Sequence, residues 1–160
     1  MLFFESDTTA MQYRIVKMRW ISREFVRANR DRIFLFGDNL AGKGFGGQAA
    51  AMRGEPNCVG IPTKKFPSSR HGAFFTDLEF DQNKAAIDHS FELLASISST
   101  TDQVIVIPAN GIGTGRAQLE SRAPLTFAYL QKRLGDLSLW PADLVSLNTL
   151  LSHLERDFQA

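Results

Sequence analysis

The stretch RIFLFGDN, residues 32–39, decides the fold, because an unbroken apolar run ends there at a Gly-Asp-Asn turn. A short run of this kind, bounded by turn residues, is typical of a strand buried on both faces. The next residues, LAGKGFGGQAAAMR (40–53), hold four glycines followed by three alanines. They predict a glycine-rich loop over 37–48 and a short helix over 48–53, so the loop lies at the carboxyl end of the strand.

Two further apolar runs have the same character. NCVGI (57–61) is followed by Pro62, which should end it, and QVIVI (103–107) runs into a second glycine-rich loop, PANGIGTGR (108–116). We also expect a strand over 13–18, a long loop over 63–78, and helices over 22–29, 81–96, 120–134 and 141–158, with Ser22 as an N-cap and Gly135 as a stop. Continuous apolar strands alternating with helices predict an α/β protein, a three-layer α/β/α fold with a mostly parallel sheet.

Length and composition predict one domain over residues 1–160, with residues 1–10 as a loose arm. The formal net charge of +1 gives no reason to expect a general polyanion binder, although a local basic patch stays open. Cys58 is the only cysteine and there are three scattered histidines, so we expect a core thiol, no disulfide, no metal site and no cofactor. No apolar run approaches the length of a membrane span, so a cytoplasmic protein without a membrane partner is expected.

Both glycine-rich loops are predicted to hold phosphate. Glycine allows close approach of a ligand to the backbone, and a helix that begins directly after the loop presents unpaired N–H groups to an anion. The alternative is a pair of tight turns, and the first loop lacks the GK[ST] ending of a P-loop. The candidate phosphate-binding residues are Lys43, Gly44, Phe45, Gly46, Gly47, Gln48, Gly111, Ile112, Gly113, Thr114, Gly115 and Arg116.

Asp38 and Asn39 are the candidate catalytic residues. A carboxylate at a strand end could accept a hydroxyl proton or orient a water molecule, whereas the alternative is that Gly-Asp-Asn merely forms a turn. The basic stretch 64–71 could contact a phosphate or a nucleic-acid backbone, or it could be a solvated loop.

The order of these motifs resembles the macrodomain family. The residues that carry the resemblance are Asp38-Asn39, the run GFGGQAA (44–50), Ile107-Pro108 and GIGTG (111–115), within a span from Ile33 to Leu130. VGIPTKK (59–65) is similar to a segment of the branch that includes the terminal ADP-ribose glycohydrolase, and the whole chain is similar to uncharacterised macro-like proteins of phages and bacteria. The resemblance implies a small macrodomain-like fold, ADP-ribose or a related nucleotide as ligand, and an ADP-ribosylated macromolecule as a possible partner. It places Asn39 toward the distal ribose and the two loops around the diphosphate.

The resemblance leaves two functions open. The glycohydrolase branch has an aspartate just after the second loop, where this chain has Arg116-Ala117-Gln118. That difference favours a non-catalytic module that recognises ADP-ribosylated molecules or sequesters a nucleotide. Asp38 and Asn39 leave hydrolysis of an ADP-ribosyl bond as the other expectation. Turnover of an ADP-ribosylated substrate would separate the two.

Overall fold

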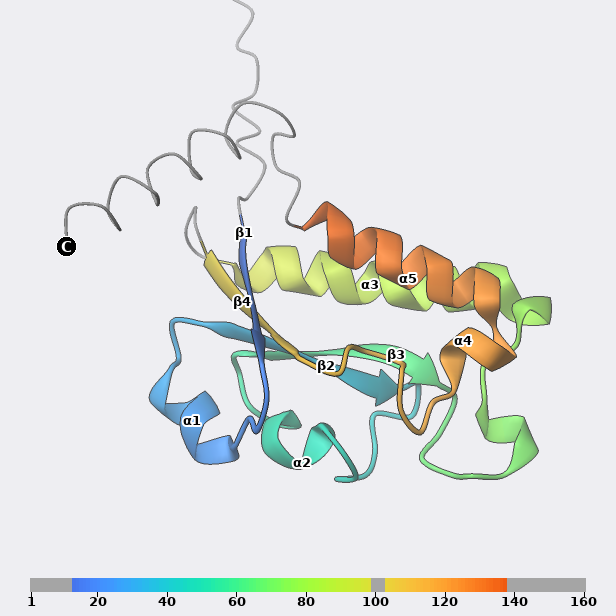
Figure 1. The fold of residues 1–160 in the computed structure, drawn as a ribbon, viewed down its shortest axis with the longest axis horizontal. Helices are drawn as coiled ribbons and strands as arrows, with labels where there is room; N and C mark the ends of the chain where they lie inside the picture. The colour runs from blue at the N-terminus through green and yellow to red at the C-terminus, as the bar shows by residue number, and fades with distance from the viewer. Residues whose placement is uncertain (1–12, 99–102, 138–160) are drawn as a thin grey trace, which may run out of the picture.

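The computed structural model describes residues 13–98 and 103–137, which form an α/β fold around one four-stranded sheet (Figure 1). The strands are β1 (Tyr13–Met18), β2 (Ile33–Asn39), β3 (Cys58–Lys64) and β4 (Gln103–Pro108). Their order across the sheet is β1-β4-β2-β3 and every pairing is parallel. The carboxyl ends of β2 and β4, which precede the two glycine-rich loops, therefore lie side by side at one edge of the sheet. The predicted fold class is confirmed.

Helices cover both faces of the sheet. The helices are α1 (Arg23–Ala28), α2 (Ala49–Met52), α3 (Phe80–Ile97), α4 (Leu119–Arg122) and α5 (Pro124–Asp136). Figure 1 shows α3 and α5 on one face and α1 and α2 on the other. Alternate β2 side chains separate accordingly: Ile33 and Leu35 pack in the α3/α5 core, and Phe34 and Phe36 pack in the α1/α2 core. This double burial explains why β2 reads as a continuous apolar run.

Pro62 does not end β3, contrary to the prediction. The strand continues through Pro62 to Lys64, and Asp38 on β2 lies opposite Pro62. A proline lacks an N–H donor, which an edge strand tolerates because one side of its backbone needs no ladder partner. Since β3 is the last strand in the sheet order, the extension carries Thr63 and Lys64 to the carboxyl edge.

The predicted helix over 120–134 is in fact two helices. Ala123 separates α4 from α5, and Pro124 occupies the first position of α5, where its missing N–H and fixed φ cost nothing. Gly135 lies inside α5 rather than stopping it. The predicted loop over 63–78 contains two 3-10 turns, η1 (His71–Ala73) and η2 (Asp77–Glu79).

Gly37-Asp38-Asn39 was expected as a turn but belongs to β2, where it pairs with the extended β3. The remaining predicted elements agree with the structure within one or two residues. Ser22 caps α1 by accepting from the Phe25 N–H at 3.1 Å, as expected. The predicted arm over 1–10 and helix over 141–158 fall outside the described residues.

Candidate functional site

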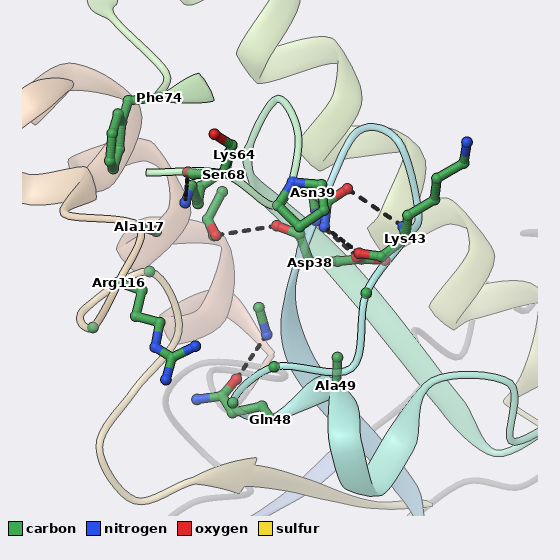
Figure 2. A pocket seen from close by; sticks show the side chains of 18 of the residues that line it. Asp38, Asn39, Lys43, Gln48, Ala49, Lys64, Ser68, Phe74, Arg116 and Ala117 are labelled. Atoms are coloured by element: carbon green, nitrogen blue, oxygen red, sulfur yellow. Dashed lines mark hydrogen bonds between the residues drawn. The ribbon is translucent and has the colours of Figure 1, made fainter. Parts of the chain in front are cut away.

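A cleft of about 910 Å³ opens at the carboxyl edge of the sheet. One wall is the first loop (37–48). The opposite wall is the end of the second loop with the two residues after it (113–118), and residues 63–69 with Phe74 close the end beyond β3 (Figure 2). The two predicted phosphate loops therefore face one cleft. Its volume falls in the upper part of the range for small-molecule sites, about 300–1,000 Å³.

Ten of the predicted site residues line this cleft: Asp38, Asn39, Lys43, Gly44, Gly46, Gly47, Gln48, Gly113, Gly115 and Arg116. Phe45, Gly111, Ile112 and Thr114 do not. Ile112 is fully buried in the α3/α5 core, and the Thr114 hydroxyl donates to the carbonyl of Asn110 within its own loop. Phe45 is 66% exposed.

Both loops leave a run of backbone donors unused. Among the described residues, the N–H groups of residues 44–48 and 112–117 donate to no protein acceptor. Gly44 and Gly113 have φ of +93° and +80°, a left-handed backbone that lets successive amides turn toward a common point. Unpaired amides clustered in a concave loop are the usual protein partners of phosphate oxygens.

Asp38 is held in an ion pair with Arg53, a residue that the sequence did not single out. Arg53 donates to both carboxylate oxygens, at 2.5 and 3.2 Å, and each side chain is only 15% exposed. The backbone N–H of Asn39 also donates to the Asp38 carboxylate, at 2.7 Å. Both oxygens of the predicted general base therefore already accept hydrogen bonds from the protein.

Arg53 also holds the first loop. Its Nε donates to the carbonyl of Gly44 at 2.6 Å and its Nη2 to the carbonyl of Lys43 at 3.2 Å. In a trans peptide the N–H points opposite to the C=O. The amides of Gly44 and Phe45 therefore point away from the guanidinium.

Asn39 is likewise engaged within the loop. Its side chain donates to the carbonyl of Lys43 at 2.8 Å and accepts from the Lys43 N–H at 3.4 Å. The Lys43 side chain extends away from the other labelled side chains in Figure 2. The Asn39 side chain is thus used to shape the loop that a ligand would contact, and the residue is only 9% exposed.

Gln48 connects the two loops. Its Oε1 accepts from the Gly37 N–H at 2.7 Å and its Nε2 donates to the carbonyl of Gly111 at 3.0 Å. Both polar atoms of the side chain are used, so Gln48 fixes the spacing between loops rather than waiting for a phosphate.

Arg116 crosses the cleft from the second loop toward the first (Figure 2). A Cβ at Gly46 would lie 3.1 Å from Arg116 Nη1. A side chain at position 46 would displace this guanidinium. No carboxylate within the described residues forms an ion pair with Arg116.

Lys64 and Phe74 form the end of the cleft and were not among the predicted site residues. Lys64 Nζ donates to the Ser68 carbonyl at 2.6 Å and lies 4.6 Å from the centre of the Phe74 ring. Burial, followed by the nearby Arg116 and Arg122 charges, lowers the pKa of Lys64. Buried and half-buried residues alternate along β3 past Pro62, and this alternation could have placed Lys64 at the carboxyl end of the strand.

The described parts of the chain hold no group of three or more His, Cys, Asp and Glu side chains placed to bind a metal ion. None of the helices in those parts is both long and apolar enough to cross a membrane.

Comparison with known proteins adds one family. No curated protein and no solved structure matches the chain. Residues 16–133 match a family described as a family of unknown function, DUF7831. The match covers most of the chain and includes every cleft-lining residue named above. The chain therefore belongs to the DUF7831 family.

Proposed function

We propose that this protein binds ADP-ribose or a closely related nucleotide in the cleft, with the diphosphate held between the two loops. The observation that carries the proposal is the pair of facing backbone segments, residues 44–48 and 112–117, whose amides have no protein acceptor in the described structure. A diphosphate has enough oxygen atoms to accept from both segments at once. A single phosphate would satisfy one of them.

The charges around the cleft support an anionic ligand. Four cationic side chains line it, Lys43, Arg53, Lys64 and Arg116, against the single carboxylate of Asp38. Arg53 already neutralises Asp38. The remaining positive charge attracts an anion, and the attraction is stronger in a partly enclosed cleft than in open water.

We propose binding without hydrolysis. A general base must be able to turn a free lone pair toward the substrate proton, and an ion pair that fixes the carboxylate opposes this. The Asp38 carboxylate accepts from Arg53 and from the Asn39 amide, and the Asn39 side chain is bonded to Lys43. These contacts favour a reader of ADP-ribosylated macromolecules, or a protein that sequesters the free nucleotide. We place it in the cytoplasm, where an unpaired cysteine such as Cys58 is common.

Isothermal titration calorimetry with ADP-ribose, ADP, AMP and adenosine tests the proposal. We expect ADP-ribose and ADP to bind, AMP to bind more weakly, and adenosine not to bind, because the diphosphate supplies the contacts. Arg116→Gln should weaken ADP-ribose binding by at least about tenfold, since a charge-assisted contact contributes about 1.5–3 kcal/mol. Lys132→Gln, an exposed site on α5, is the matched control and should leave binding unchanged.

Two results would overturn the proposal. One is tighter binding of adenosine than of ADP, which would mean that the loops do not hold phosphate. The other is release of ADP-ribose from a mono-ADP-ribosylated protein by the parent but not by Asp38→Asn. That second result would make the protein a hydrolase despite the ion pair.

A further inference from the structure

Positive charge is concentrated in one short part of the chain. Residues 13–32 contain seven of the 18 Lys and Arg residues but only two of the 17 acidic ones. The segment has a net charge of +5, whereas the whole chain has +1. It comprises β1, α1 and the approach to β2. The near-neutral total therefore conceals a strongly basic region outside the cleft.

The strand register puts one of these arginines, Arg14, on the face that α1 covers. Ile15 packs with the α3/α5 core, so its neighbour Arg14 points to the opposite face of β1. Arg14 pairs with Val104 of β4, which packs with the α1/α2 core.

Helix α1 adds to this positive charge. Arg23, Arg27 and Arg30 all reach one carboxylate, that of Glu55, each at 2.8 Å. Three cations share one anion, so the cluster keeps a net positive charge. Arg27 and Arg30 remain 61% and 43% exposed.

Trp20 lies between β1 and α1, with its side chain in solvent. It is 95% exposed and follows Arg19 directly after β1. Its φ is +58°, a left-handed conformation that a bulky residue rarely adopts. An exposed indole on a strained backbone has no role in the core, and such strain is typical of binding positions.

We propose that a basic face around α1 binds single-stranded nucleic acid; it comprises Arg14 of β1, Arg19 and Trp20 between β1 and α1, and Arg27 and Arg30 around Glu55. The arginines would contact phosphates and Trp20 would stack on an unpaired base. The proposal does not depend on the ligand of the cleft. A bilayer fits this face less well, because α1 has only six residues and exposes no large hydrophobic side chain.

The stretch 64–71, considered from the sequence as a nucleic-acid contact, is a weaker choice. Lys64 bonds to the Ser68 carbonyl, and Lys65 forms an ion pair with Glu79. Both ammonium groups already have protein partners.

Fluorescence anisotropy with a labelled single-stranded oligonucleotide of mixed sequence, titrated with the full chain at several salt concentrations, tests the proposal. The double variant Arg14→Gln/Arg19→Gln should reduce the slope of log K against log salt by about 1.4, since each phosphate contact on a single strand contributes about 0.7. Trp20→Ala should weaken binding at least about fivefold and leave the slope unchanged. Lys132→Gln removes one charge from the other side of the sheet and is the matched control.

The basic face is the wrong site if Lys132→Gln lowers the slope as much as one arginine change, or if the double variant binds like the parent. Equal binding of a duplex with no effect of Trp20→Ala would overturn the single-strand assignment. Binding of anionic vesicles, with no binding of the oligonucleotide, would replace nucleic acid by a membrane surface.

Discussion

Replacing Gly46 with valine tests whether the first loop holds a phosphate. The φ of Gly46 lies outside the left-handed region, so a β-carbon adds no backbone strain there. Its nearest neighbour would be Arg116 Nη1 at 3.1 Å, the mobile end of a long side chain. We therefore expect the free energy of unfolding to change by less than about 1 kcal/mol.

The effect on binding should be larger. The valine side chain occupies the space between the loop amides and Arg116, where a phosphate would lie. Losing one charge-assisted contact costs about 2 kcal/mol, which weakens ADP-ribose about thirtyfold. Calorimetry measures the affinity, after circular dichroism has established that the variant is folded.

The control and the comparison follow from the other glycines. Gly72 lies outside the cleft with ordinary φ and no atom within 4 Å of a built Cβ, so Gly72→Val should bind like the parent. Gly113 is a poorer test, because a Cβ there would lie 3.0 Å from the buried Leu119 side chain, at a φ of +80°. Gly113→Ala should destabilise the fold by more than about 1 kcal/mol. A folded Gly46→Val protein that binds ADP-ribose as tightly as the parent would refute a phosphate site between the first loop and Arg116.

Three other predictions concern single side chains. Gln48→Leu leaves the Gly37 N–H and the Gly111 carbonyl without their partner, so urea unfolding should show a loss of about 1–3 kcal/mol; Gln48→Glu, whose second oxygen would face the Gly111 carbonyl oxygen, should show at least as large a loss. Hydrogen bonds from Arg23 and Arg30 lower the pKa of Glu55 from 4.5 to about 2, so its contribution to stability is complete above pH 4.5 and is lost as the pH falls toward about 2. Glu55→Gln should flatten the fall in unfolding free energy across that window; an equally steep fall would contradict the assignment. Burial, and then the Glu55 charge, raise the pKa of Cys58 from its ordinary value of 9.0 to about 12, so its thiolate is about a thousandfold scarcer, and a thiol reagent should label this half-buried side chain much more slowly in the folded protein than after denaturation.

The fold was predictable because apolar runs report burial on both sides of a sheet. The runs at 32–36, 57–61 and 103–107 became β2, β3 and β4, and the alternation of strands with helices determined the layers. The end of β3 depended on tertiary context instead. A proline ends an interior strand, but Pro62 is on an edge strand, and whether a strand is at the edge follows from the sheet order rather than from the local sequence.

The part of the site formed by backbone N–H groups was predictable from the sequence. Glycine spacing marks loops that can expose N–H groups, and both loops line the cleft. The partners of side chains could not be predicted, because they join positions far apart in the sequence. Asp38 and Arg53 are 15 residues apart, and Gln48 and Gly111 are 63 apart.

Those side-chain partners change the expected chemistry more than the fold does. From the sequence, Asp38 was a carboxylate at a strand end, with either a catalytic or a turn role. In the structure its Oδ2 lies where a Cβ on Gly60 would come within 2.4 Å, so the strand beside it must carry glycine for the carboxylate to fit. The carboxylate, packed on Gly60 and paired with Arg53, holds the arginine that orients the carbonyls of Lys43 and Gly44. An acid at this strand end can therefore serve binding by shaping the loop backbone, and a hydrolytic role would require Arg53 to release it.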